Sequence, residues 1–300
     1  MSCRSMLRLD ARNIGGVPVS NLNPGASLPD PLHARSHAEA NVLERHMLEA
    51  RGLTKYYSAI TGVRDVNFRI PAGTVLGLLG PNGSGKSTTV GMLTGLLEPS
   101  GGTVTLDGMN IRDDLLKYKR GLGYVPEEAQ LYTWMSGGEY LTFCARLRGL
   151  PASIANRRID ALLGIFGLQT DRDAPMTAYS KGMRQKILLS AALVHNPSIV
   201  ILDEPCSGLD VGATLVIRSL VQRLAASGRI VIYSSHELEM VEKVCSEVLI
   251  LREGRVAAHA ATATIREQVN AASLEDAFRT LVFTTDVDAV ASEIMAAIAD

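Results

Sequence analysis

Residues 80–87 read Gly80-Pro-Asn-Gly-Ser-Gly-Lys-Ser87, and this stretch decides the fold of the chain. It follows the pattern GxxxxGK[ST], and it stands between the apolar run Thr74–Leu79 and a segment with helical spacing, Ser87–Leu97. Its glycines let the backbone wrap around phosphate with the N–H groups pointing inward. The helix that follows adds its positive N-terminal end. A buried strand, this loop and a helix therefore predict a site for nucleotide phosphates.

Two side chains in this loop have expected chemical roles. Lys86 should reach the β- and γ-phosphates of bound ATP, and the Ser87 hydroxyl should bind Mg²⁺. A chance glycine-rich turn is the alternative, but it would have no reason to join a buried strand to a helix. The expected nucleotide-binding residues run through the loop without a break: Gly80, Pro81, Asn82, Gly83, Ser84, Gly85, Lys86, Ser87 and Thr88.

A second pair of candidate residues ends the segment Ser198-Ile-Val-Ile-Leu-Asp-Glu204. Phosphoryl transfer needs a further Mg²⁺ contact and a group that activates water. Asp203 is the expected metal-side carboxylate, and Glu204 is the expected general base for the hydrolytic water. An acidic cap at the end of a strand is the alternative, and the phosphate loop upstream favours the catalytic interpretation.

His236 is the third expected catalytic residue, with Lys86 and Glu204. It follows another apolar run, Ile230–Tyr233, which is typical of a buried strand. A neutral imidazole at this position can hydrogen-bond the γ-phosphate, or it can orient Glu204 and the water. A lone histidine is ordinarily a surface or packing residue, but its place after a core strand favours the functional interpretation.

The composition is that of an ordinary globular chain. Of the 300 residues 46% are hydrophobic and 20% are charged, and the formal net charge of −1 gives no reason to expect nucleic acid as a partner. No apolar run approaches the roughly 18–20 residues that span a bilayer, so we expect a soluble chain that reaches a membrane only through a partner. The cysteines are too far apart for a metal pair and are expected to be free thiols: Cys3, Cys144, Cys206 and Cys245.

Apolar runs and helical segments alternate from Met47 onward, which predicts an α/β fold with a mainly parallel core sheet. Residues 137–196 are expected to form an inserted helical subdomain. Residues 259–300 are expected to form a helical tail, with a capping-box-like helix start at Ser273-Leu-Glu-Asp276. Residues 1–46 carry turns without periodicity. They are expected to be a flexible extension or the product of an upstream start codon, with a regulatory arm as the alternative.

Over roughly residues 47–258 the order and spacing of the motifs resemble the ATP-binding subunit of an ABC transporter. The resemblance implies a P-loop NTPase fold with an antiparallel N-terminal β subdomain beside the core sheet. Leu53-Thr-Lys-Tyr-Tyr57 is similar to the loop that stacks on adenine, with Tyr57 preferred to Tyr56 as the stacking residue. The other matching segments are the Walker A loop Gly80–Thr88, the Walker B strand Ile199–Glu204, the D-loop Ser207-Gly-Leu-Asp210 and the switch histidine His236.

Two segments compete for the family's signature loop, which is usually spelled LSGGQ. Met135-Ser-Gly-Gly-Glu139 has the closer spelling. Tyr179-Ser-Lys-Gly-Met183 has the right position, because it opens a helix that leads into the Walker B strand. We therefore choose Tyr179–Met183, and we interpret Ser136–Glu139 as the N-cap of a helix through Leu147.

The resemblance implies a head-to-tail dimer with two shared ATP sites. Ser180 and Gly182 are expected to face the γ-phosphate bound by the other subunit, and Asp210 of the D-loop is expected beside the same nucleotide. Lys181, in place of the first glycine of the usual signature, adds positive charge near phosphate. Glu127, in Tyr124-Val-Pro-Glu127, stands where the family usually has Gln, and it is still expected to bind Mg²⁺ or its water.

The expected partners are a second ATP-binding subunit, in a homodimer, and a separate integral membrane permease. The chain is then expected in the cytoplasm, peripheral on the inner face of the plasma membrane. The signature spelling resembles bacterial exporters of drugs, polysaccharides, antibiotics or lipid-like cargo, although the cargo itself is not readable. A soluble ABC-type ATPase acting on nucleic acid or ribosomes is the alternative function. A degenerate regulatory subunit is a third, and the presence of Glu204 and His236 argues against it.

Overall fold

The computed structural model of the chain describes residues 46–58, 60–128, 130–282 and 287–299. The expected N-terminal extension lies outside the described residues except for His46, and Cys3 lies outside them as well. The described cysteines, at positions 144, 206 and 245, are free thiols, as the sequence predicts. No helix in the described part of the chain is long and apolar enough to cross a membrane.

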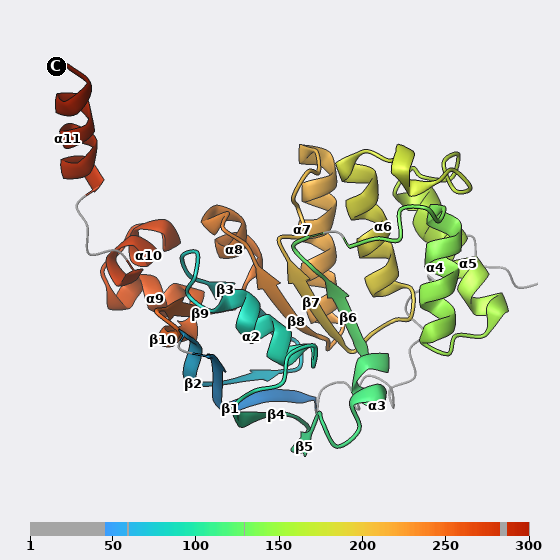
Figure 1. The fold of residues 1–300 in the computed structure, drawn as a ribbon, viewed down its shortest axis with the longest axis horizontal. Helices are drawn as coiled ribbons and strands as arrows, with labels where there is room; N and C mark the ends of the chain where they lie inside the picture. The colour runs from blue at the N-terminus through green and yellow to red at the C-terminus, as the bar shows by residue number, and fades with distance from the viewer. Residues whose placement is uncertain (1–45, 59, 129, 283–286, 300) are drawn as a thin grey trace, which may run out of the picture. The chain divides into compact units, whose positions relative to one another are not determined.

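Within the described residues, a six-stranded sheet forms the centre of the fold, in the order β10-β9-β3-β8-β7-β6 (Figure 1). Its strands run parallel except at one edge, where β10 pairs antiparallel with β9. The predicted mainly parallel core sheet is therefore confirmed. The strands are β3 (Val75–Leu79), β6 (Leu122–Val125), β7 (Ile199–Asp203), β8 (Ile230–Ser234), β9 (Glu247–Arg252) and β10 (Arg255–Ala261).

Side chains of the central strands alternate between two apolar clusters, which is why the strand sequences are continuously apolar. In β7, Ile199 and Ile201 join the cluster shared with a second sheet, whereas Val200 and Leu202 join the cluster on the opposite face. All positions of β7 are buried. The strand therefore holds its last residue, Asp203, at a fixed place on the carboxyl edge of the sheet.

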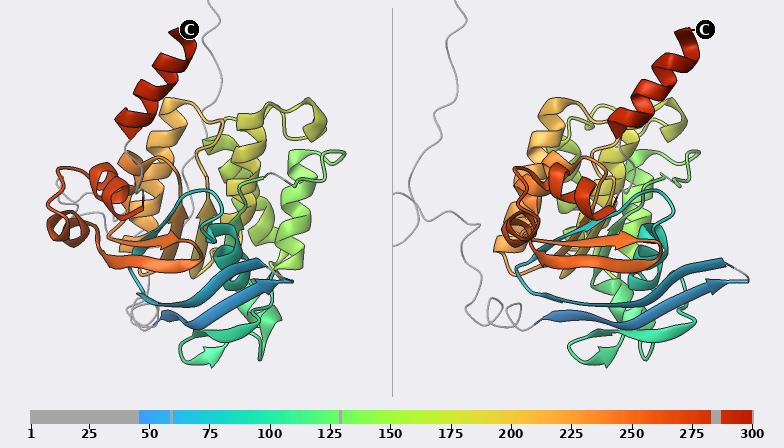
Figure 2. Two further views of the ribbon diagram at one scale, coloured as in Figure 1. Left: turned by 60° about the vertical axis from the view of Figure 1, so that its left-hand side comes forward. Right: turned by 90° about the vertical axis from the view of Figure 1, so that its left-hand side faces the viewer.

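That second sheet is antiparallel, with the described strands in the order β2-β1-β4-β5 (Figure 2). Helix α2 (Lys86–Leu93) lies between the two sheets, and its Val90, Met92 and Leu93 belong to their shared apolar cluster. This arrangement is the antiparallel N-terminal β subdomain that the resemblance implies. Its strands are β1 (Met47–Tyr57), β2 (Ile60–Pro71), β4 (Gly101–Leu106) and β5 (Met109–Asn110).

Helix α2 ends earlier than the sequence predicts. The prediction of a helix as far as Leu97 is wrong, because Gly95 adopts a φ of +66° and turns the chain. A Cβ atom on Gly95 would lie 2.4 Å from Leu115 Cδ1. The glycine therefore ends α2 and also leaves room for the following helix, α3 (Leu115–Arg120).

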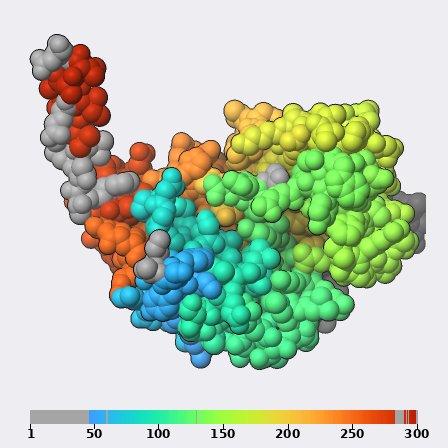
Figure 3. Space-filling view, in the orientation of Figure 1, coloured from blue at the N-terminus to red at the C-terminus, as the bar shows by residue number. Residues whose placement is uncertain are grey.

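The segment 137–196 is mostly helical, as predicted, and it has an apolar cluster of its own. Its helix α6 contributes Ile187 to this cluster and Leu188 to the cluster of the core sheet, so α6 ties the subdomain to the core. Figure 3 shows the subdomain as the green and yellow surface on the right of the molecule. The elements are α4 (Gly137–Leu147), α5 (Ala152–Ile165), the 3₁₀ turn η1 (Met176–Ala178) and α6 (Lys181–Leu193).

The C-terminal segment begins as part of the core sheet. The expected boundary after residue 258 falls inside β10, and helices α9 and α10, which follow β10, pack on the core. Ile265, Leu274 and Ala277 are fully buried there. The remaining helices of the described chain are α7 (Val211–Ala226), α8 (Leu238–Val244), α9 (Thr262–Gln268), α10 (Leu274–Val282) and α11 (Val287–Ala299).

His195, just after α6, is a mostly buried imidazole that should make stability depend on pH. Its Nε2 lies 3.0 Å from the Leu122 carbonyl oxygen, and burial lowers its pKa to about 4 from the ordinary 6.5. Between about pH 6.5 and pH 4, the His195 imidazole therefore binds a proton more readily in the unfolded chain than in the folded chain. The stability from this site is complete above pH 6.5 and is lost as the pH falls towards 4, by at most about 1.4 kcal/mol per pH unit.

We expect the urea midpoint of the native chain to fall more steeply between pH 6.5 and 4 than that of His195→Gln, which has no imidazole to protonate. Urea unfolding at a series of pH values measures both slopes. Equal slopes for the two proteins would contradict the assignment of this pH dependence to His195.

Candidate functional site

The phosphate loop follows β3 and passes directly into α2, as the sequence predicts. Gly80 takes a φ of +153° and Gly85 a φ of +103°, which are conformations that other residues rarely adopt. A Cβ atom on Gly80 would lie 2.4 Å from the Leu251 carbonyl oxygen, and one on Gly85 would lie 2.4 Å from Val63 Cγ1. Glycine is therefore required at both positions, for conformation and for space.

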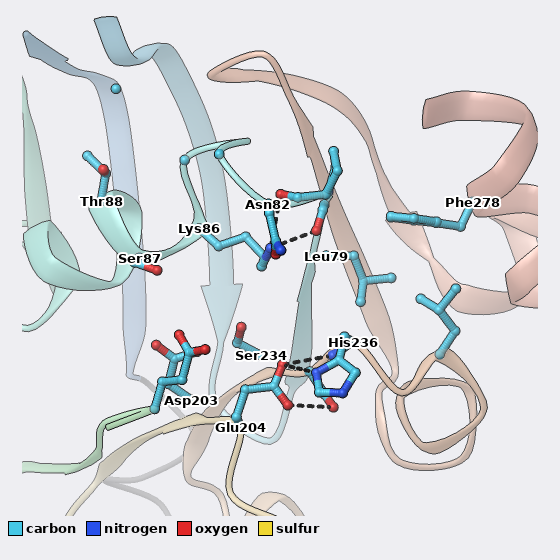
Figure 4. A pocket seen from close by; sticks show the side chains of 18 of the residues that line it. Leu79, Asn82, Lys86, Ser87, Thr88, Asp203, Glu204, Ser234, His236 and Phe278 are labelled. Atoms are coloured by element: carbon cyan, nitrogen blue, oxygen red, sulfur yellow. Dashed lines mark hydrogen bonds and ion pairs between the residues drawn. The ribbon is translucent and has the colours of Figure 1, made fainter. Parts of the chain in front are cut away.

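The Lys86 side chain folds back over its own loop (Figure 4). Its Nζ donates hydrogen bonds to the carbonyl oxygens of Gly80, at 2.6 Å, and Pro81, at 3.1 Å. Burial lowers the pKa of this amine, and three nearby carboxylates oppose that shift. The amine is thus held at the loop, where the sequence places the β- and γ-phosphates.

A cavity of about 1050 Å³ opens along this loop. It is bounded by the loop, by the residues that follow β7 and β8, and by the edge of the antiparallel sheet. A cavity of this size can enclose a nucleotide-sized ligand. The sequence-predicted site residues that line it are Tyr57, Gly80, Pro81, Asn82, Gly83, Gly85, Lys86, Ser87, Thr88, Glu127, Asp203, Glu204 and His236.

Ser84 belongs to the loop but does not line the cavity. Its side chain is 2% exposed, and its Oγ has no hydrogen-bond partner among the described residues. A Cβ atom on Gly80 would come within 2.3 Å of that Oγ. The Ser84 side chain therefore packs behind the loop, so that a contact with nucleotide has to come from its backbone.

Asp203 ends β7 at the cavity, beside the carboxylates of Glu127 and Glu204. Burial raises the pKa of the Asp203 carboxyl to about 6, and both neighbouring carboxylates act in the same direction. These neighbouring carboxylates repel one another, and a bound divalent cation would offset that repulsion. The described chain has no group of three or more His, Cys, Asp or Glu side chains that could hold a metal ion.

Glu204 is held by the loop that follows β8 (Figure 4). Its Oε1 accepts a hydrogen bond from the His236 backbone N–H at 2.9 Å and lies 2.8 Å from His236 Nδ1. Its Oε2 accepts a hydrogen bond from Ser235 Oγ at 3.3 Å. The bond to Glu204 raises the pKa of His236. Glu204 also takes a φ of +47°, which is uncommon for a residue with a side chain. These contacts direct the carboxylate into the cavity.

Tyr57 lies at the end of the cavity formed by the antiparallel sheet. Its hydroxyl is 3.4 Å from Thr88 Oγ1, and a Cβ atom on Gly62 would lie 2.7 Å from Tyr57 Cε2. Tyr56 is equally exposed but does not line the cavity. The position of Tyr57 thus agrees with the preference for it as the residue that stacks on adenine.

Ser180 and Gly182 lie at the start of α6 and do not line the cavity of their own chain. Ser180 is exposed, and its Oγ accepts a hydrogen bond from the Met183 N–H at 3.2 Å. A Cβ atom on Gly182 would lie 2.9 Å from the Gly208 carbonyl oxygen, so the segment expected to be the signature loop packs closely on the segment expected to be the D-loop. Asp210 also lies outside the cavity, where its Oδ1 accepts from the Ala213 N–H at 2.8 Å and caps α7.

The competing segment Met135–Glu139 forms the N-terminal cap of helix α4. Ser136 is 5% exposed and forms a capping box with Glu139, in which each side chain accepts a hydrogen bond from the other residue's backbone N–H, at 3.2 and 2.8 Å. Ser136 is thus the helix N-cap that the sequence predicts. Its buried hydroxyl is not available to a phosphate on another chain, which favours Ser180.

The cavity also has lining residues that the motifs do not indicate. Ser234 and Ser235 directly precede His236. A pair of hydroxyls at the end of a core strand is a feature of the sequence from which their place in the cavity could have been predicted. Leu79, Leu238 and Phe278 form an apolar part of the wall. Figure 4 shows Leu79 and Phe278 there, and nothing in the sequence indicates that Phe278 of α10 reaches the nucleotide cavity. The remaining two lining residues that the motifs do not indicate are Thr61 and Gly62.

Comparisons with known proteins agree with this geometry. A family model described as "ABC transporter" matches residues 63–207. The linearmycin resistance ATP-binding protein LnrL of Bacillus subtilis (strain 168) is 36% identical over 212 residues, which are 71% of this chain and 68% of the relative. The daunorubicin/doxorubicin resistance ATP-binding protein DrrA of Streptomyces peucetius is 31% identical over 229 residues, which are 76% and 69% of the two chains.

A solved structure of the ATP binding subunit of an ABC transporter is 33% identical to this chain. The two superpose with a TM-score of 0.74, over 78% of this chain and 99% of the other.

Proposed function

Because the chain belongs to the ABC transporter family and is one of its ATP-binding, ATP-hydrolysing subunits, we propose that it drives export through a separate membrane permease. The observation that carries the hydrolytic part of the proposal is the Glu204 carboxylate, which His236 holds at the cavity of the phosphate loop. The resistance names of LnrL and DrrA support a drug or an antibiotic as cargo, and a polysaccharide- or lipid-like cargo is proposed from the resemblance of the sequence alone. The alternative, action on nucleic acid or ribosomes, is not favoured by these relatives.

The chain's own residues divide the work of hydrolysis. Lys86 and the backbone N–H groups of residues 80–88 bind the β- and γ-phosphates, while Tyr57 stacks on adenine. Glu204 takes a proton from the water that attacks the γ-phosphate. His236 keeps that carboxylate in place through its two contacts with Oε1.

The residues present fit a Mg²⁺ ion. Ser87 offers a hydroxyl, and Asp203 and Glu127 offer carboxylates to the same cavity. These are the oxygen ligands that Mg²⁺ prefers, and the phosphates and water complete its coordination. When bound, the ion offsets the negative charge of the phosphates.

A second copy of the chain completes the site in this proposal. Ser180, Gly182 and the N-terminal end of α6 lie away from the cavity of their own chain and are open to another one. Helix N-termini bind anions, so this loop would cover the γ-phosphate bound by the partner, with Asp210 beside it. Bound ATP then stabilises a head-to-tail homodimer, and hydrolysis releases it.

The proposed location follows from the proposed partner. A subunit that drives a permease with cellular ATP lies in the cytoplasm, on the inner face of the plasma membrane. No nucleic-acid partner is proposed, because the net charge of −1 provides no basic field. The domain plan consists of an extension at 1–46, an ATP-binding domain at 47–258 and a tail at 259–300 that starts within β10.

Purification from membranes tests the transport role. The tagged chain, expressed in its native host and extracted in mild detergent, is expected to carry an integral membrane protein through affinity and size-exclusion steps. A parallel extraction of the tagged protein from the cytosolic fraction measures the unattached share. A chain that never associates with an integral membrane protein would contradict the role of transport subunit while leaving its ATPase activity intact.

A further inference from the structure

One carboxylate on α8 joins this helix to both C-terminal helices of the core. Helix α8 begins at Leu238, directly after the loop that carries His236. Glu242 Oε1 accepts a hydrogen bond from Arg266 Nη1 of α9 at 2.8 Å. Its Oε2 accepts a hydrogen bond from the backbone N–H of Leu274, the first residue of α10, at 3.2 Å. A change in the position of α8 would therefore break contacts to α9 and α10 together.

The contact with Leu274 completes the N-terminal cap of α10. Ser273 Oγ accepts from the Asp276 N–H at 3.1 Å, as the sequence predicts for this helix start. The Leu274 N–H has no acceptor within its own helix, and Glu242 supplies one. The negative charge is also favourable at the positive end of the helix. Glu242 and α10 therefore stabilise each other in one relative position.

Phe278 extends the same helix to the nucleotide cavity (Figure 4). It is 9% exposed and lines the cavity together with Leu79 and Leu238. Leu79 is the last residue of β3 before the phosphate loop, and Leu238 is the first residue of α8. All three belong to, or pack against, one apolar cluster. Helix α10 thus shares one apolar cluster with the strand that precedes the phosphate loop and with the helix that follows His236.

We propose that α9 and α10 form a brace that positions His236 for ATP hydrolysis, with Glu242 and Phe278 as positioning residues. Glu242 fixes α8, the loop before α8 carries His236, and His236 holds the Glu204 carboxylate. The brace rests on the proposed roles of Glu204 and His236. Since Glu242 does not line the cavity, its loss affects the rate of hydrolysis and leaves the binding of ATP unchanged.

The test compares Glu242→Ala with Glu239→Ala in the full-length chain. Both glutamates lie on α8, but Glu239 pairs with Lys243 on the exposed side of the same helix. Glu242→Ala should lower kcat about tenfold and change KM for ATP less than twofold, because small displacements of catalytic groups affect rate more than binding. Glu239→Ala should change neither constant. If Glu242→Ala does not fold, Glu242→Gln takes its place. It removes the negative charge that faces Arg266 but keeps an acceptor for the Leu274 N–H, so a smaller fall in kcat is expected, with KM unchanged.

Phe278 gives an independent variant. Phe278→Ala should also lower kcat, and Phe278→Leu, which keeps an apolar side chain against Leu79 and Leu238, should restore most of the rate. In a His236→Ala background, Glu242→Ala should cause no further loss, because its effect passes through His236. If the losses in kcat of His236→Ala and Glu242→Ala multiply in the double variant, the proposed brace is overturned.

Two further outcomes distinguish a failure of the proposed brace from a failure of the proposed catalytic site. If His236→Ala lowers kcat and Glu242→Ala leaves it unchanged, or lowers only the melting temperature, the brace is overturned and the proposed site stands. If His236→Ala itself leaves kcat unchanged, the role of His236 in hydrolysis fails, and the brace fails with it.

Discussion

Replacing Glu204 with Gln is expected to lower the rate of ATP hydrolysis by about 10²- to 10⁴-fold while ATP still binds. Gln has nearly the shape of Glu, and its side-chain oxygen can still accept the hydrogen bond from His236. It cannot take a proton from the attacking water. Phosphate release in the steady state measures the rate, and equilibrium titration with ATP measures the affinity.

The matched control is Glu128→Gln. Glu128 is exposed and does not line the cavity, so the same substitution should leave both the rate and the affinity unchanged. Normal turnover in Glu204→Gln would show that another group accepts the proton. Loss of ATP binding would show that Glu204 supports the phosphate loop rather than the chemistry.

Ser180→Arg is expected to prevent ATP-driven pairing of two chains and to lower hydrolysis about 10²-fold, the loss that follows removal of an anion-binding group from a site. Ser180 is exposed at the start of α6, so an arginine there is accommodated within its own chain. The larger side chain would obstruct the surface that faces the other chain's γ-phosphate. Hydrolysis at several protein concentrations measures both effects, because pairing depends on concentration.

The control for this variant is Ser136→Ala. Ser136 is 5% exposed, so an arginine would disturb its packing, whereas alanine removes only the helix cap. The loss of the cap should lower the free energy of unfolding by about 1 kcal/mol and leave hydrolysis and pairing unchanged. The opposite pattern, with pairing lost in Ser136→Ala and retained in Ser180→Arg, would make Met135–Glu139 the signature loop.

The sequence predicts those parts of the nucleotide cavity that depend on residues close together in the chain. A phosphate loop needs glycines at fixed positions, a buried strand before it and a helix after it, and all of these are visible in residues 74–93. Asp203 and His236 follow continuously apolar strands, and the carboxyl ends of parallel strands meet at one edge of the sheet. The assembly of these groups in one cavity follows from that topology.

Other features depend on tertiary contacts that a pattern does not contain. The end of α2 is set by the turn at Gly95 and by the approach of Leu115, which lies outside any window on the helix. The burial of Ser84 depends on how closely it packs against Gly80. The most distant case is Phe278, because its place in the cavity depends on how α10 packs on α8.

The choice of Tyr179–Met183 as the signature loop rests on position rather than on spelling. Met135-Ser-Gly-Gly-Glu139 is closer in letters to the usual motif, but its serine and glutamate are joined in a capping box. Tyr179–Met183 differs more in letters, and it presents an exposed serine at the start of the helix that leads to β7. The assignment of Ser180 to a phosphate on another chain stays a prediction.

The central claim is that one chain holds only half of each ATP site. The most direct measurement is the mass of Glu204→Gln in solution by light scattering, with and without ATP and Mg²⁺, because this variant binds ATP without consuming it. We predict a rise from 32.1 kDa to twice that mass on addition of ATP, and no rise in Glu204→Gln/Ser180→Arg. A mass that stays at 32.1 kDa while ATP is bound would contradict the shared site.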